Sequence, residues 1–184
     1  YSAEWHIEAK KRGLPVIENN FEALDALSNP ETFEIFEKYK VYTKTELLAL
    51  KSILGDSLIT PVLIEMGVLK DMISTGVLPA IVEYVAKLKN VNDILKDDDL
   101  LESFGNIYRA LKEGVKKLMH QRETLEEMIK GESHDFKKIA AFIYGEVRPV
   151  MEEIKHHSDI AEATLPNSLW PYPSIRSLVH SFEE

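Results

Sequence analysis

Cysteine is missing from all 184 residues of the chain. A secreted scaffold held by disulfides, a zinc site built on thiolates and a cysteine nucleophile are therefore excluded. A chain of this length can bury a sizeable core, so it needs neither disulfides nor a structural metal. The absence of cysteine fits a reducing compartment, and we expect a cytoplasmic protein.

Positive charge is scarce, since 22 Lys and Arg face 31 Asp and Glu, and the formal net charge is −9. An acidic surface repels phosphate backbones, and no basic run carries interleaved aromatics, so we expect no nucleic-acid partner. No stretch is typical of a signal peptide or a membrane span. The most apolar region, 58–85, is interrupted by Glu65, Lys70, Asp71 and Glu83, which indicates a core helix and no membrane partner.

Glycine-rich phosphate loops, strand-like alternation, internal repeats and low-complexity linkers are also missing. The eight glycines are scattered, and none forms GxGxxG or GxxxxGK. Serine, histidine and acidic residues are present, but nothing places a serine on a strained elbow between strand and helix. The sequence therefore predicts no catalytic and no cofactor-binding residue.

A helical period is present over most of the chain. Thr43 and Glu46 match a capping box, and apolar residues then recur at steps of three or four from Leu47 to Leu88. Similar patterns cover 100–128 and 135–161. Three prolines lie inside these patterns and predict a bend or break near each: Pro61, Pro79 and Pro149.

Shorter helices come first in the chain. One covers 3–12 and is closed by Gly13, a second is capped by Asn20, and a third is capped by Asn29 before Pro30. Long helices joined by short turns pack antiparallel. The predicted fold is all-α: an elongated antiparallel bundle of three long helices, with short N-terminal helices and a docked Pro/aromatic tail. We expect one domain over 1–184, made of 1–42, 43–164 and 165–184.

Two clusters could suggest a metal site. The acidic run 97–99 precedes a helix, where acids favour the positive helix end, and we interpret it as a cap. Glu153 and His156 match the Glu-x-x-His spacing of di-iron bundles once, without a second copy. We therefore predict no metal ligand and interpret the histidine as solvated; a metal-dependent bundle enzyme around this pair remains an alternative.

The tail carries the candidate docking residues: Trp170, Pro171, Tyr172, Pro173 and Leu178. Prolines restrict the backbone beforehand, and the aromatic rings offer large apolar surfaces. Either the tail folds back on its own bundle, or it docks on a neighbouring domain or subunit.

Four segments, EWHIEAKKRGLP, FEKYKVYTKTELLAL, GVLPAIVEYVAKL and LWPYPSIRSLV, together resemble, in this order, the C-terminal region of type III glutamine synthetases. One departure is Leu50-Lys51-Ser52, where the family often carries Arg-Tyr-Glu. The resemblance implies a subunit that ligates ammonia to glutamate with ATP and Mg²⁺ or Mn²⁺, using ligands upstream of Tyr1. Because the chain starts at Tyr1 and not at Met, we expect a fragment.

The resemblance further implies dodecamers, so the expected partners are the chain's own upstream catalytic domain and neighbouring subunits. Our leading hypothesis is a non-catalytic scaffold or assembly domain of such a ligase, in which this fragment alone is not an enzyme. The alternative is a free-standing helical module that binds a partner through its tail or through a groove between helices.

Overall fold

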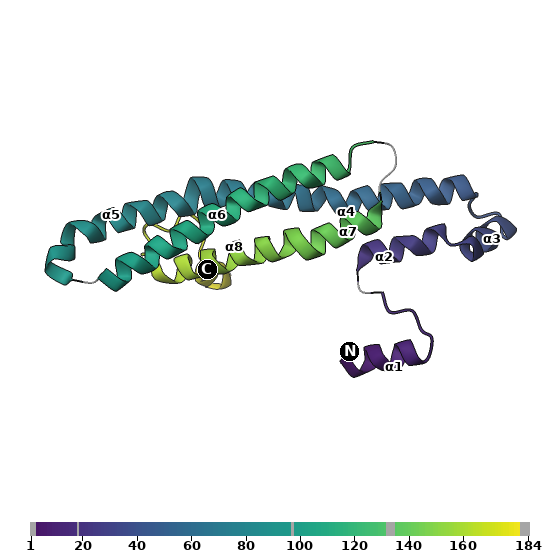
Figure 1. Cartoon of the computed structure of the whole chain (residues 1–184), viewed down its shortest axis with the longest axis horizontal. Coiled ribbons are helices and arrows are strands. Elements are labelled where there is room, and N and C mark those ends of the chain that lie inside the picture. Colours follow the sequence, from purple (N-terminus) through teal and green to yellow (C-terminus); the bar gives the residue numbers. More distant parts are fainter. Residues whose placement is uncertain (1–2, 18, 97, 132–134, 181–184) are drawn as a thin grey trace. The chain divides into compact units, whose positions relative to one another are not determined.

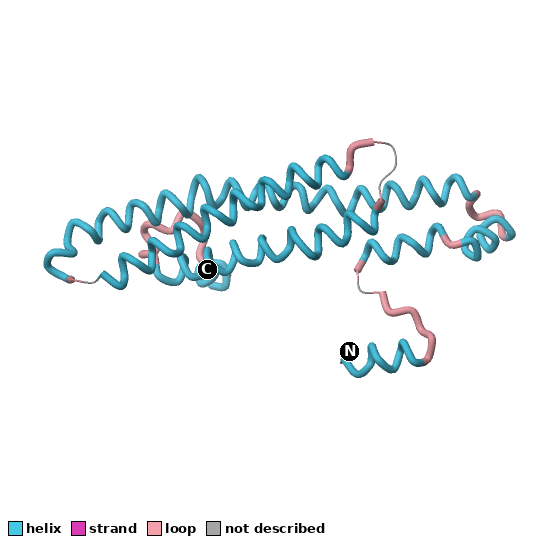
Figure 2. Tube along the Cα trace, in the orientation of Figure 1, coloured by secondary structure: helices cyan, strands magenta, loops and turns pink. Residues whose placement is uncertain are grey.

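A computed structural model describes residues 3–17, 19–96, 98–131 and 135–180 (Figure 1). All regular structure in this described part is helical, which confirms the all-α prediction (Figure 2). The helices are α1 Ala3–Lys11, α2 Asn20–Asp25, η1 Ala26–Ser28, α3 Pro30–Lys38, α4 Lys44–Met72, η2 Ile73–Val77, α5 Leu78–Leu95, α6 Asp98–Met128, α7 Phe136–Phe142, η3 Ile143–Val147, α8 Arg148–Thr164 and α9 Ile175–His180.

Local capping chemistry sets several of these boundaries. The carboxylate of Glu46 accepts hydrogen bonds from the backbone N–H and the hydroxyl of Thr43, at 2.7 and 2.8 Å, as the capping box predicts. Asn29 caps α3 by accepting from the N–H of Glu31, 3.2 Å away. Gly13 adopts a φ of +72° after α1, where a residue with Cβ would be strained.

Asn19, and not Asn20, caps α2, because its side-chain oxygen accepts from the N–H of Glu22 at 3.0 Å. The prediction placed the cap one residue late, since either asparagine offers the same side chain. Residue 97, the first of the acidic run interpreted as a cap, lies outside the described residues. Asp135, where the last long helical pattern starts, accepts a hydrogen bond from the N–H of Lys138 at 3.2 Å.

The chain divides into two compact units, residues 1–62 with 131–140, and residues 63–130 with 141–184. The prediction of a single domain stays a prediction. In the first unit, the rings of Phe21 and Phe136 lie 6.4 Å apart, and Leu47 and Ile59 are buried. A Cβ at Gly55 would lie 2.2 Å from the ring of Phe136, so the ring fits only because position 55 has no side chain.

In the second unit α5, α6 and α8 lie side by side (Figure 1), with α6 contacting both others. Its core consists of large apolar side chains that are almost fully buried, among them Met66, Phe104, Leu111, Leu118, Leu125 and Ile154. Gly114 lets α6 approach α8, because a Cβ there would come within 2.7 Å of Ile154. Packing around this core fixes the helices whose outer residues form the surface of the second unit.

Two of the three internal prolines follow a π-helical turn. η2 precedes Pro79 and η3 precedes Pro149, and in each the N–H next to the proline bonds a carbonyl five residues back. A proline lacks an N–H and crowds the carbonyl of the residue four before it, and a wider turn relieves both problems. Both turns share the spacing Ile-x3-Val-x-Pro, a similarity confined to seven residues.

Pro61 behaves differently. It is exposed, and α4 continues through it from Lys44 to Met72 without a change of helix type. A break at this position was therefore the wrong prediction. One lost hydrogen bond on the outer side of a long helix is tolerated when the residues on the inner side, such as Ile59 and Val62, are buried.

Candidate docking site

The tail leaves α8 through a short turn. Leu165 is buried and extended, and the N–H groups of Leu169 and Trp170 donate to the carbonyl of Pro166 at 2.8 and 3.2 Å. The indole of Trp170 then meets the phenol ring of Tyr172 edge to face, with 6.1 Å between the ring centres. This geometry presents the two aromatic side chains together.

Tyr172 anchors the tail on α4. Its hydroxyl donates a hydrogen bond of 2.8 Å to the main-chain carbonyl of Met72, the residue immediately before η2. Gly76 makes room for the ring, because a Cβ there would lie 2.3 Å from the Tyr172 oxygen. The tail therefore docks on its own chain at the π turn that precedes Pro79.

The candidate docking residues separate into two groups. Trp170 and Tyr172 are half-buried against their own chain, whereas Pro171 and Pro173 are exposed. Leu178, on α9, is 55% exposed. The tail thus folds back through its aromatic residues, and the predicted role of all five residues in a contact with another domain or subunit stays a prediction.

Sequence reasoning missed the receiving side of this contact. Met72 accepts through its backbone, so its residue type carried no signal. Gly76 could have been found, because it lies three residues before a proline in a helical pattern, where both residues weaken the helix. The spacing Ile-x3-Val-x-Pro, which occurs at both π turns, also marked the segment that contains Gly76 as unusual.

An apolar groove lies next to this anchor, between the second half of α4 and α8. Its volume is about 440 Å³, and its walls are mostly apolar: Ile64, Glu65, Val68, Leu69, Met72, Arg148, Met151, Glu152 and Lys155. Three side chains on α4 at steps of four stay exposed, Ile64 at 60%, Val68 at 50% and Met72 at 38%. Glu65 and Arg148 bridge the two helices with 3.6 Å between their charged atoms.

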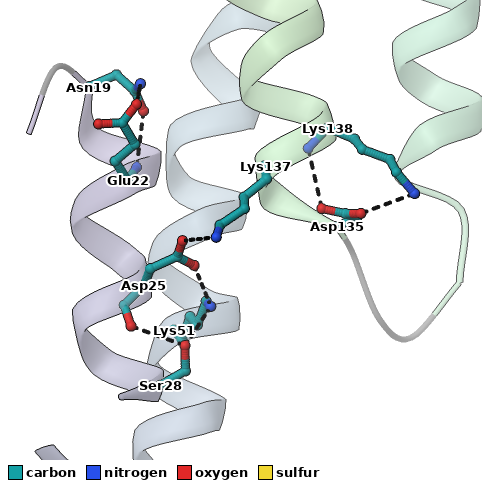
Figure 3. Close-up of polar contacts among 8 residues, drawn as sticks. All are labelled: Asn19, Glu22, Asp25, Ser28, Lys51, Asp135, Lys137 and Lys138. Carbon is teal, nitrogen blue, oxygen red and sulfur yellow. Dashed lines mark hydrogen bonds and ion pairs between the residues drawn. The ribbon is translucent and has the colours of Figure 1, made fainter.

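A polar cluster links three helices of the first unit (Figure 3). The carboxylate of Asp25 pairs with Lys51 at 3.0 Å and with Lys137 at 3.1 Å, so it joins α2, α4 and α7. Lys51 also donates to the hydroxyl of Ser28 at 2.8 Å, and its side chain is only 18% exposed. Lys51 belongs to the Leu50-Lys51-Ser52 segment, where the resembled family often carries Arg-Tyr-Glu. Its contacts with Asp25 and Ser28 show that this segment makes polar contacts here too.

The pKa values of three carboxyl groups follow from such contacts. Partial burial raises the pKa of Asp25, but the hydrogen bonds and charges of Lys51 and Lys137 outweigh it and hold the pKa below its ordinary value. The Lys138 N–H lowers the pKa of Asp135, and the Thr43 N–H lowers the pKa of Glu46. The charges of these carboxyl groups therefore stabilise helix ends and contacts between helices.

The described residues contain no group of three or more His, Asp or Glu that could hold a metal ion. His156 and His157 lie with 5.5 Å between ring centres, on neighbouring positions of α8. The side chains present here therefore do not fit the divalent metal that the resemblance implies for a whole synthetase.

Within the described part, the helical stretch Lys44–Asn92 is long and apolar enough to cross a membrane, judged by length and composition alone. Only 22% of its most apolar window is buried in the structure. A core helix of a soluble protein passes the same test, so this is weak evidence for a membrane span. The low burial does show that apolar side chains along this helix lack a cover within the described residues.

The described residues thus form an all-α helical domain with a folded-back aromatic tail and an uncovered apolar groove. The family model described as "Glutamine synthetase C-terminal domain" matches residues 1–96. The chain belongs to this family, which bears out the resemblance seen in the sequence.

Known relatives agree. The chain is 27% identical to a glutamine synthetase of Bacteroides fragilis (strain YCH46) and 28% identical to a type-3 glutamine synthetase of Dictyostelium discoideum. Both matches cover 97% of this chain. A glutamine synthetase of Butyrivibrio fibrisolvens is 27% identical over 98% of the chain. The match covers only 26%, 26% and 27% of these proteins, so the chain spans about a quarter of their length.

Proposed function

We propose that this chain is the non-catalytic helical scaffold of a longer glutamine synthetase, which ligates ammonia to glutamate with ATP hydrolysis in the cytoplasm. The observation that carries the proposal is the coverage: nearly the whole chain aligns with about a quarter of each synthetase relative. The remaining three quarters of such a protein offers ample length for a separate catalytic domain.

The uncovered surface supports an assembly role. A groove with apolar walls and three exposed apolar residues on α4 is costly to leave in water, and such a patch typically marks a contact with another protein surface. In the proposal this surface and the tail meet the subunit's own catalytic domain or a neighbouring subunit. The family's dodecamer would then depend on contacts of this kind.

In this proposal, catalysis takes place in the rest of the longer protein and not in this chain. In the proposal, ATP and Mg²⁺ or Mn²⁺ bind the catalytic domain of the longer protein. For the metal, this is supported by the described residues, which contain no group of three or more His, Asp or Glu that could hold it. In the proposal, no residue of this chain takes part in a step of the reaction. Its contribution is to hold subunits in place, so its loss should change assembly first and activity as a consequence.

The test compares the longer synthetase that carries this chain with a version that ends before Tyr1. We expect the shortened enzyme to lose its large oligomer in sedimentation velocity, and the 184-residue chain alone to form no glutamine from glutamate, ammonia and ATP. A shortened enzyme that assembles and works like the complete one would overturn the proposal. So would a gene in which this chain has its own start codon, which favours the free-standing module.

A further inference from the structure

The outer face of α8 carries a stripe of alternating charge. Arg148, Glu152, Lys155 and Asp159 follow one another at steps of four, three and four. With 3.6 residues per turn these four positions fall within about 60° of one another, and at about 1.5 Å per residue they extend over about 16 Å. The stripe borders the apolar groove, since Arg148, Glu152 and Lys155 also line it.

Ion pairs within the same molecule occupy only some of the charges in this stripe. Lys155 pairs with Asp159 one turn further along α8, while Arg148 reaches across to Glu65 on α4 at the long distance of 3.6 Å. The side chains stay open to water, with exposed fractions of 45% for Arg148, 69% for Lys155 and 45% for Asp159. All four charges can therefore contact another surface.

The order of the charges has a specific symmetry. Read in one direction along α8 it is positive, negative, positive, negative, and read backwards every sign is reversed. An antiparallel second copy of α8 therefore opposes each charge with its opposite. Arg148 would meet Asp159 of the other copy, and Glu152 would meet Lys155. Contacts of this kind across a twofold axis involve the same patch on both partners.

We propose that this face of the second unit, formed by the α8 stripe and the α4 residues Ile64, Val68 and Met72, binds a second copy of this chain antiparallel across a twofold axis. The apolar groove supplies the affinity and the charge stripe selects the register. The inference deepens the proposed assembly role and rests on it for its biological purpose.

Charge also decides against other occupants. A basic partner would find opposite charge at only two of the four positions, and an acidic partner at the other two. Two copies with a net charge of −9 repel each other over most of their surface, whereas the stripe itself is neutral. A second copy can therefore approach this neutral face more easily than it could approach a uniformly acidic face.

The test uses charge reversal in the 184-residue chain. We expect the unmodified chain to dimerise with rising concentration in sedimentation velocity. Glu152→Lys should weaken the dimer at least about tenfold, because two like-charged contacts appear per dimer, and Lys155→Glu should do the same. A mixture of the two variants should dimerise again, since each restores the opposite charge that the other needs.

Matched controls come from α6, where Lys116 and Glu113 form an exposed pair away from the groove. Glu113→Lys and Lys116→Glu make the same charge changes and should leave the dimer unaltered. Val68→Asn should weaken the dimer without a charge change, because it removes an exposed apolar side chain from the groove. Far-UV circular dichroism checks that each variant remains helical.

Three results would overturn the inference: a chain that stays monomeric at all concentrations, a dimer indifferent to both reversals, or variants that fail to associate when mixed although both are folded. These results leave the proposed function standing if the longer synthetase still needs this domain for assembly. Conversely, a dimer of the isolated chain together with a dispensable domain would reject the proposed function alone.

Discussion

The hydroxyl of Tyr172 donates a hydrogen bond of 2.8 Å to the main-chain carbonyl of Met72, one hundred residues earlier in the chain. Met72 also lines the apolar groove, so a single residue belongs both to the anchor of the tail and to the uncovered surface. Because the acceptor lies immediately before the π turn that accommodates Pro79, a local backbone feature and a distant aromatic residue meet at one point.

Removing this hydroxyl tests the anchor. Tyr172→Phe keeps the ring but loses the hydrogen bond, and we expect it to lower the free energy of unfolding by about 0.5–1.5 kcal/mol in urea denaturation. Tyr39→Phe is the control, since Tyr39 is 69% exposed, and it should change little. Equal effects of both substitutions would mean that the Tyr172 bond does not stabilise the fold.

The two π turns provide a matched pair of glycines. Gly76→Ala puts a Cβ 2.3 Å from the Tyr172 oxygen, so we expect displacement of the tail and a loss of about 1–3 kcal/mol. Gly145→Ala in η3 meets nothing within 4 Å, and alanine is the better helix former, so it should stabilise by about 0.5–1 kcal/mol. Thermal unfolding of both variants measures the difference, and tail displacement should also appear as a change in Trp fluorescence.

The Asp25 cluster predicts a loss of stability in acid. Because Lys51 and Lys137 hold the folded pKa of Asp25 below its unfolded value of 3.8, the stabilisation is present above about pH 4 and is lost as the pH falls through the folded pKa. Asp25→Asn should therefore destabilise the chain at pH 7 and make its stability depend less on pH below 4. Urea unfolding between pH 7 and pH 2.5 measures this. An unchanged pH profile in the variant would show that the cluster contributes nothing.

Lys40 ends the α3 region with a φ of +54°, a left-handed conformation that costs energy for a residue with Cβ. The N–H of Val41 bonds the carbonyl of Phe36 at 3.0 Å there, which is the pattern of a glycine-type helix end. Lys40→Gly should therefore stabilise the fold by about 0.5–1 kcal/mol in thermal unfolding. Lys38→Gly, inside the last turn of α3, should have the opposite sign.

Sequence periodicity and capping residues predicted the elements well. The capping box of Thr43 and Glu46, the cap at Asn29 and the helix end at Gly13 depend on neighbours within four residues, so short-range chemistry determines them. The prolines show the limit of such reasoning. Pro61, Pro79 and Pro149 carry the same local signal, yet α4 passes through the first unbroken and π turns precede the other two.

The docking site shows the same limit more strongly. Trp170 and Tyr172 were visible as unusual residues, but the carbonyl of Met72 and the space at Gly76 become a receptor only when distant segments are packed. Composition and short-range pattern thus decided the fold class and the helix ends, because a helix depends on contacts within a turn or two. The likeness to a family came from four segments in a fixed order along the chain. Where the tail docks and which apolar side chains stay uncovered was decided by tertiary packing, because a hydrogen bond across one hundred residues or a groove between helices has no counterpart in any local stretch.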